Sequence, residues 1–308
     1  MGIVRNAEFP LDASFQMDAA GNITVDQMLK EPTRITRYVT EKINQDLLSN
    51  KIYSSGPVSG GIIMYNQITG KINLGETALR TAVVAPGGEF PEIDQAQVSE
   101  RFTGVKKIGG RVTITDEAVK RNDTRFLNQE LFRLANRMTT DLDADAVAAF
   151  DKAMAQPEVD AQVVESNGWA KVNKTKAADK VPALSVEADL EALRLKTDLI
   201  ALGYSYSTLL LHPADASRLR LAVGIGNEQT FMGQWGYTIE VSKHVPEGEG
   251  WLLAPKQLGY MGVETPVSTE TERDMLHQVT NTVTFATMGY AITDPYALVK
   301  ITGLNKEA

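Results

Sequence analysis

The residues of this chain that could do chemistry are its histidines, a serine two positions after a glycine, and one close group of aspartates. His212, His244 and His277 lie in unrelated contexts, and none has the HExxH or H-x-E spacing that holds a zinc ion. A lone histidine at the end of a strand is more often structural than catalytic. The chain has no cysteine, which excludes thiolate nucleophiles, disulfides and cysteine-ligated metals.

Three further segments approach known motifs but miss a required residue. Residues 203–207 (GYSYS) start like a nucleophile elbow but have serine where the second glycine belongs. Residues 224–229 (GIGNEQ) break the dinucleotide-binding pattern at its last glycine. Asp141, Asp143 and Asp145 resemble the start of a calcium loop without its glycine and distal glutamate, so we expect a solvated helix face. We predict no catalytic, cofactor-binding or metal-binding residues, and a protein that is not an enzyme.

Composition narrows the class of protein. The 308 residues, 43 % of them hydrophobic, are enough for two ordinary domains with real cores. The net charge of −8 argues against a nucleic-acid-binding surface, because phosphate contacts need clustered Lys and Arg. No apolar run reaches the length of a membrane span, and the N-terminus lacks the apolar core of a signal peptide. We expect a soluble protein of intracellular origin.

One long helix dominates the elements that would position any site. No glycine or proline occurs between Gly110 and Pro157. Apolar residues recur there at close to the helical period, at Leu127, Leu131, Leu134, Met138, Leu142, Phe150 and Met154. Asp123 or Thr124 can cap the start. A helix from there to Gln156 is about 45–50 Å long at 1.5 Å per residue, which exceeds the diameter of a small domain. We therefore expect that most of it is not a buried core helix.

The segments around this helix are β-prone and broken by glycine and proline. Residues 62–74 (IIMYNQITGKINL) and 78–86 (ALRTAVVAP) predict two antiparallel strands around a tip near residues 70–76. Residues 101–115 add two strands, followed by a short helix. Residues 181–262 predict a compact α/β region, after which two β runs are split by Asp294-Pro295. Residues 224–236 (GIGNEQTFMGQWG) indicate a glycine-rich loop, either a mobile surface loop or a contact between subunits.

Taken in order, these segments resemble the major capsid proteins of tailed bacteriophages, which have the Hong Kong 97 fold. PGGEFPEI…KKIGGRVTITDEAV resembles the end of that family's extended loop and the start of its spine helix. LLLHPADASRL…GYTIEVSKHVPEGEGWLLAPKQLGYMGVE…TERDMLHQ…YAITDPYALVKITG resembles its axial domain and final peripheral strand. The resemblance covers residues from about 33 to 303 and rests on order and spacing, since no single motif is very specific.

The resemblance implies a mixed α/β (α+β) fold of the Hong Kong 97 type. It divides the chain into an N-terminal arm (1–57), an extended β-hairpin loop (58–97), a peripheral domain (98–180) with a spine helix (124–156), an axial domain (181–262), and a final part (263–308) with the peripheral-domain loop, last strands and C-terminus.

The function it implies is that of a major capsid protein of a tailed double-stranded DNA bacteriophage, which assembles in the host cytoplasm and resides in the virion. Its hexamers and pentamers would build an icosahedral head around DNA bound without sequence specificity. The implied partners are a separate scaffolding protein, a portal, and a decoration or minor capsid protein, with no membrane and no cofactor. An encapsulin-like nanocompartment shell, which shares the fold, is the alternative. A soluble enzyme with an unrecognised site is a third reading.

The expected interface residues fall into three groups. The extended loop would place apolar side chains against a neighbouring subunit, namely Ile68, Ile72, Leu74, Leu79 and Val83. A loop resembling the family's contact at quasi-threefold positions carries Glu270, Glu272, Arg273 and Asp274. The glycine-rich loop contributes Phe231 and Trp235.

Two features of the family are not expected here. Some members link a loop lysine to an asparagine of a neighbour with the help of a glutamate. Lys71 lies on the loop, but residues 280–291 contain no carboxylate, so we expect no covalent cross-links. Many relatives also carry a cleaved N-terminal scaffolding region; the short arm after Met1 favours a separate scaffolding protein without processing.

Overall fold

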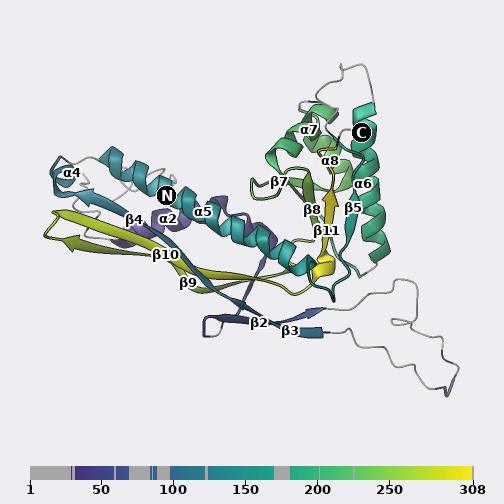
Figure 1. Ribbon diagram of the computed structural model, residues 1–308, viewed down its shortest axis with the longest axis horizontal. Coiled ribbons are helices and arrows are strands. Elements are labelled where there is room, and N and C mark those ends of the chain that lie inside the picture. The colour runs from purple at the N-terminus through teal and green to yellow at the C-terminus, as the bar shows by residue number, and fades with distance from the viewer. Residues whose placement is uncertain are drawn as a thin grey trace, which may run out of the picture.

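The protein has an elongated lobe and a compact α/β lobe, joined by one long helix (Figure 1). The architecture comes from a computed structural model, which describes residues 29, 32–58, 60–68, 84, 86–88, 98–121, 124–169, 181–200, 202–224 and 226–306.

The elongated lobe is a four-stranded sheet in the order β1-β9-β10-β4. Its strands are β1 (Ser54–Gly56), β9 (Gly259–Asp274), β10 (Val279–Ile292) and β4 (Lys106–Thr115). β9 and β10 form a long antiparallel hairpin, β4 runs antiparallel to β10, and β1 runs parallel to β9. Helix α2 (Pro32–Asp46) packs against this sheet together with the long helix. The core between them contains Ile35, Val39, Ile43, Ile114, Leu127, Leu131 and Ala286.

Two short helices adjoin this sheet. Helix α4 (Asp116–Lys120) follows β4 directly, and the Thr115 hydroxyl accepts a hydrogen bond from the Ala118 amide at 3.3 Å. This confirms the short helix expected after residue 115, because a threonine at this position satisfies an otherwise free amide. Helix α3 (Ser49–Ile52) is a single turn between α2 and β1.

The compact lobe is a five-stranded sheet in the order β5-β11-β8-β6-β7. Its strands are β5 (Val163–Glu165), β6 (Thr208–Leu211), β7 (Thr238–Val241), β8 (Glu249–Leu253) and β11 (Leu298–Thr302). Its helices are α6 (Val181–Ile200), α7 (Pro213–Val223) and α8 (Glu228–Trp235), and a 3-10 turn, η2 (Pro295–Ala297), leads into β11. Strands β6 and β8 are almost wholly buried, which explains their continuous apolar sequence.

The long helix, α5, spans Thr124–Met154 and confirms the expected spine helix. Its 31 residues correspond to about 46 Å. The expectation that most of it lies outside a core is wrong for one face. Leu127, Leu131 and Leu142 belong to the core of the elongated lobe, whereas Val147 and Phe150 belong to a second core at the junction of the lobes. The apolar face of α5 can therefore be buried along its whole length, because its first part packs in one core and its second part packs in the next.

A separate two-stranded sheet projects beside α5 (Figure 1). Strand β2 (Ile62–Ile68) pairs antiparallel with β3 (Val98–Gly104), with Met64 opposite Phe102. The sequence predicted that this first strand pairs with residues 78–86. Over residues 62–68 that prediction is wrong, because β2 pairs with β3 instead. Residues 69–83, including the expected tip, Lys71, Ile72, Leu74, Leu79 and Val83, lie outside the described residues.

Two expected loops are regular elements. Residues 228–235 form helix α8 rather than a loop. Gly236, in the left-handed conformation (φ 73°), ends this helix. Glu270, Glu272, Arg273 and Asp274 belong to the end of β9, not to a loop. The division predicted from the sequence separated residues 263–308 from residues 181–262. The last strand, β11, nevertheless lies in the same sheet as β6 and β8. The domain division itself stays a prediction.

Candidate assembly surfaces

His212 and His277 are used for local structure. Nδ1 of His212 accepts a hydrogen bond from the Ala214 amide at 3.2 Å and so caps α7. Burial lowers the pKa of the half-buried His244. Within the part of the chain that the structure describes, no three histidine, aspartate or glutamate side chains gather in a way that could hold a metal ion. Among the described residues, these side chains therefore form no metal site.

The three aspartates of α5 point to different partners. Asp141 pairs with Arg137 at 3.1 Å, and Asp145 pairs with Lys106. Asp143 instead is half-buried and accepts a hydrogen bond from the Leu48 amide at 3.1 Å. A calcium loop needs its carboxylates to converge on one point, and these diverge. The interpretation as a solvated helix face is right for Asp141 and wrong for Asp143.

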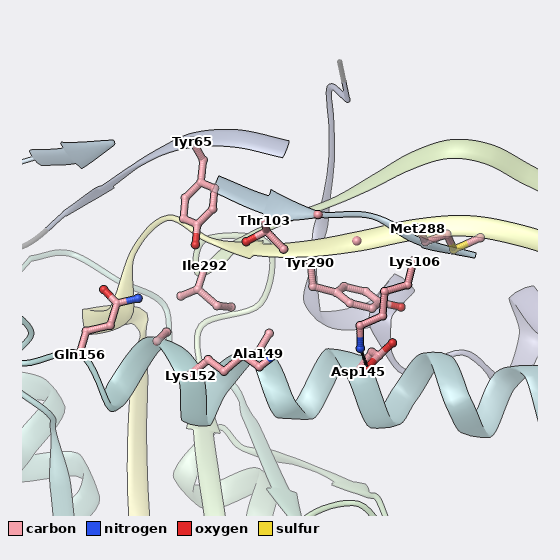
Figure 2. A pocket seen from close by; sticks show the side chains of 13 residues that line it. Tyr65, Thr103, Lys106, Asp145, Ala149, Lys152, Gln156, Met288, Tyr290 and Ile292 are labelled. Carbon is pink, nitrogen blue, oxygen red and sulfur yellow. Dashed lines mark hydrogen bonds and ion pairs between the residues drawn. The ribbon is translucent and has the colours of Figure 1, made fainter. Parts of the chain in front are cut away.

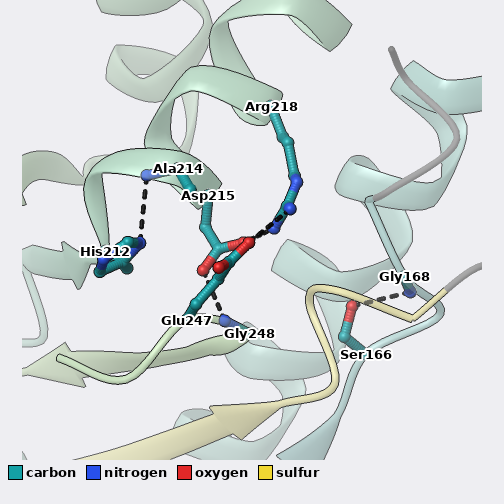
Figure 3. Close-up of polar contacts among 8 residues, drawn as sticks. All are labelled: Ser166, Gly168, His212, Ala214, Asp215, Arg218, Glu247 and Gly248. Carbon is teal, nitrogen blue, oxygen red and sulfur yellow. Dashed lines mark hydrogen bonds and ion pairs between the residues drawn. The ribbon is translucent and has the colours of Figure 1, made fainter. Parts of the chain in front are cut away.

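A buried acidic group in the compact lobe is also structural (Figure 3). Asp215 is fully buried, pairs with Arg218 at 2.5 Å, and accepts the Gly248 amide at 2.7 Å. Arg218 also forms an ion pair with Glu247 at 2.6 Å. The carboxylate thus joins α7 to the turn before β8. A buried charge that is fully paired within its own chain is a structural feature rather than a reactive one.

A small pocket lies between the base of the two-stranded sheet, α5 and β10 (Figure 2). Tyr65 and Thr103 line it from the sheet, Lys152 from α5, and Ile292 from β10. It encloses about 80 Å³. Small-molecule sites usually enclose about 300–1,000 Å³, so this pocket is too small for a cofactor.

The outer face of the two-stranded sheet is apolar and exposed. We call Ile62, Met64 and Phe102 the hairpin patch; their side chains share one face of the β2–β3 ladder, because paired residues point to the same side. Met64 is 62 % exposed and Phe102 is 63 % exposed. Such a cluster of large apolar side chains on a short sheet is typical of a protein–protein contact.

The inner face of this sheet is anchored to the chain's own body. Ile63 is fully buried, and a Cβ built on Gly262 or Gly289 would come within 2.7 Å or 2.9 Å of its Cδ1 atom. A side chain at either position would therefore have to displace Ile63. The Gln67 side chain donates to the Ile292 carbonyl at 3.1 Å. These contacts hold the two-stranded sheet, and with it the hairpin patch, against the rest of the chain.

The β9–β10 hairpin ends in a second exposed apolar feature. Its turn carries Met275 and Leu276, which are 79 % and 92 % exposed. Asp274 holds the turn by accepting the Leu276 amide at 2.9 Å and pairing with His277 at 2.6 Å. The hydrogen bond from His277 is the main reason that the pKa of Asp274 is lowered.

The charged residues before this turn are divided between two faces. Strand alternation places Glu270, Glu272 and Asp274 on one face and Arg273 on the other. Arg273 pairs with Asp116 of α4 at 2.6 Å within the same chain. The expected charged cluster therefore exists as two separate surfaces, and its contact with other subunits stays a prediction.

The remaining expected contact residues are partly covered by their own chain. Phe231 and Trp235 lie on α8 and pack, half-buried, against the core of the compact lobe. Ile68 also packs against this core. The pairs Met64–Phe102 and Met275–Leu276 were not among the expected interface residues. A signal for the second pair was available, because two large apolar residues between polar ones in a tight turn cannot reach a core.

Comparison with known proteins decides the family. A family model described as phage capsid protein matches residues 99–301, about two thirds of the sequence. The chain belongs to the phage capsid protein family. No curated protein matches the sequence significantly. Within the described residues, no helix is long and apolar enough to cross a membrane.

Solved structures extend the similarity of this capsid protein over most of its length. The virus-like particle from Pyrococcus furiosus is 10 % identical with a TM-score of 0.61, covering 88 % of this chain and 99 % of that one. The capsid of cyanophage P-SCSP1u is 15 % identical with a TM-score of 0.59, covering 84 % and 89 %. The SrpI encapsulin of Synechococcus elongatus PCC 7942 is 13 % identical with a TM-score of 0.52, covering 87 % and 89 %.

These similarities establish the Hong Kong 97-type capsid fold, a mixed α and β architecture, as expected. The capsid protein is a structural subunit of a self-assembling shell and a component of the virion capsid. The hairpin patch and the β9–β10 turn are then its candidate assembly surfaces, because a shell subunit must bury apolar area against copies of itself.

Proposed function

We propose that this capsid protein is the major capsid protein of a tailed double-stranded DNA bacteriophage. The family match over residues 99–301 is the observation that carries this proposal. Its hexamers and pentamers would form an icosahedral head around the genome, assembled in the host cytoplasm. The net charge of −8 supports a shell that encloses DNA without adhering to it.

We further propose that neighbouring copies meet at the described surfaces. The hairpin patch would cover another subunit, in line with the expectation for the whole segment 58–97. The charged end of β9 would contribute a contact where three subunits meet, and α8 would add Phe231 and Trp235. Support comes from the exposure of Met64 and Phe102 on the paired strands β2 and β3 and of Met275 and Leu276 in the β9–β10 turn, because unpaired apolar side chains on ordered elements favour association.

The proposed partners follow from the same assignment. A head needs a portal for DNA entry, and a separate scaffolding protein would set its curvature. A decoration or minor capsid protein would bind the outer surface. None of these partners requires a catalytic residue, a cofactor or a membrane contact from this chain.

An encapsulin-like compartment is the second candidate, favoured by the likeness to the SrpI encapsulin. Cryo-electron microscopy of shells made from this chain together with its neighbouring genes separates the two. A phage head is expected to recruit a portal at one vertex and to take up DNA. A closed shell that instead encloses a co-expressed enzyme, with no portal vertex and no DNA, would favour the compartment and contradict the proposal.

A further inference from the structure

Helix α6 has two apolar faces, and only one of them packs within its own chain. The inner face contributes Val186, Leu190, Leu193 and Ile200 to the core of the compact lobe, and each of these side chains is at most 2 % exposed. A helix on the surface of a protein usually has one apolar stripe, which faces the core. Since α6 lies along the edge of the compact lobe (Figure 1), the opposite side of the helix faces away from that core.

This outer side carries a second apolar stripe, which we call the α6 seam: Ala188, Ala192, Leu195 and Leu199. The steps of four, three and four residues between them place all four on one face of the helix. The same spacing lets one helix pack against another in a coiled coil. Leu195 is 59 % exposed and Leu199 is 55 % exposed. The described part of the chain therefore leaves the seam uncovered.

Charged residues border the α6 seam on both sides, with opposite signs. At about 100° per residue, Glu191 and Asp198 lie along one side of the seam and Lys196 lies along the other. Glu191 and Asp198 both lie near Tyr237, directly before β7, which agrees with their sharing one side of the helix. Arg194 is also near Tyr237, but it lies further round the helix from the seam. The border nearest the seam on this side is therefore acidic.

We propose that the α6 seam binds an amphipathic helix of another protein. The bound helix has apolar residues along its centre and lysine or arginine along the edge that faces Glu191 and Asp198. Charges at such flanking positions determine which helices pair and in which orientation. A second copy of α6 in antiparallel orientation is disfavoured, because a two-fold axis would place the acidic border opposite itself. The proposal goes beyond the proposed function and holds for a phage head or a compartment.

Fluorescence anisotropy with two synthetic peptides tests this proposal on unassembled subunits of the full chain. Both peptides are about three heptads long with leucine at the core positions, and they carry either lysine or glutamate at the flanking positions. The lysine peptide should bind at least about tenfold more tightly than the glutamate peptide. Equal affinities would overturn the proposal. So would no binding of the lysine peptide, which is also the result expected if another part of this chain covers the seam.

A pair of variants separates the seam from a general attraction to an acidic protein. Leu195→Glu/Leu199→Glu adds two negative charges to a net charge of −8, so general attraction would strengthen binding of the lysine peptide. Loss of the seam should instead weaken that binding at least about tenfold. The matched control, Leu221→Glu/Val241→Glu, adds the same charge at positions that are 47 % and 40 % exposed in the same lobe, and it should not weaken binding. Equal effects of the two variants would contradict the proposal.

A second variant leaves the leucines in place and covers the case in which their replacement prevents folding. Glu191→Gln/Asp198→Asn should reduce the preference for the lysine peptide over the glutamate peptide by at least about threefold, because the acidic border is lost. Its control, Glu117→Gln/Glu264→Gln, removes the same charge from exposed positions of the elongated lobe and should keep the wild-type preference. An unchanged preference in Glu191→Gln/Asp198→Asn would refute the role of the border.

Shell assembly distinguishes another protein from another copy of this chain as the occupant of the seam. Subunits with Leu195→Glu/Leu199→Glu should form shells as the wild type does, measured by sedimentation velocity and cryo-electron microscopy. Loss of shells in this variant would place the seam between copies. That result would overturn this proposal while leaving the proposed capsid function intact.

Discussion

Met64 and Phe102 face each other across the β2–β3 ladder, and each side chain is more than half exposed. We expect Met64→Glu with Phe102→Glu to reduce shell assembly by at least about tenfold, since buried apolar anchors typically contribute about 2 kcal/mol each. The free energy of unfolding of the unassembled subunit should change by no more than about 0.5 kcal/mol, because both sites are on the surface. Sedimentation velocity measures the first quantity and urea titration the second.

The matched control for this pair is Glu100→Gln, an exposed change on the same ladder opposite Asn66. It should leave assembly at the wild-type level. Normal shells from the Met64→Glu/Phe102→Glu variant would show that the hairpin patch does not contact another subunit.

Reversal of charge at Arg273 separates an internal ion pair from a contact between subunits. The pair with Asp116 is exposed and should contribute only about 0–1 kcal/mol to the subunit. We expect Arg273→Glu to impair assembly while thermal unfolding of the subunit changes little. Combining Arg273→Glu with Asp116→Arg restores the internal pair but not a contact with a neighbour. Recovery of assembly in this double variant would refute a role between subunits.

Removal of the Asp189 carboxylate should destabilise the compact lobe. Asp189 is fully buried on α6 and accepts hydrogen bonds from the Asn167 amide at 3.1 Å, the Trp169 indole at 2.8 Å and the Ser166 hydroxyl. We expect Asp189→Ala to lower the free energy of unfolding by about 3–5 kcal/mol, because each buried donor left without a partner costs about 1–3 kcal/mol. Urea unfolding of the subunit measures this loss. Asp198→Ala, exposed on the same helix, should cost less than about 0.5 kcal/mol.

Shells should contain no covalent links between subunits. Strand β10 provides no carboxylate that could take a proton from an attacking lysine, and a lysine with an ordinary pKa of about 10.4 is a poor nucleophile near neutral pH. Boiling shells in detergent should therefore release a band at 33.6 kDa without larger species. A ladder of multiples of this mass would contradict the prediction.

Local patterns in the sequence predicted most of the helices and strands. The apolar period and Pro157 placed the spine helix at 124–156, against an observed end at Met154. The pairing of β2 with β3 was missed, because strand partners depend on contacts between residues far apart in sequence. Helix α8 was missed because Gly233 and Gly236 indicated a loop, whereas Gly236 ends a helix.

The candidate assembly surfaces were less predictable than the fold. Exposure depends on which face of a strand meets the body, and alternation alone does not show whether Ile63 or Met64 points outward. The packing of Ile63 against Gly262 and Gly289 determines which of the two side chains points inward. This packing joins segments about 200 residues apart in the sequence. Similarly, the charged run at the end of β9 gave no sign that Arg273 would pair with Asp116.

The sharing of α5 between two cores also bears on how the subunit unfolds. Phe150 stacks within the junction core, and Leu131 is fully buried in the elongated lobe, on one continuous helix. Neither the core of the elongated lobe nor the junction core can open without exposing apolar residues of the helix that both cores share. Denaturation of the isolated subunit should therefore be a single cooperative transition, with calorimetric and van't Hoff enthalpies in agreement. For a shell, we expect a mechanical load on one of these two cores to be resisted by the stability of both.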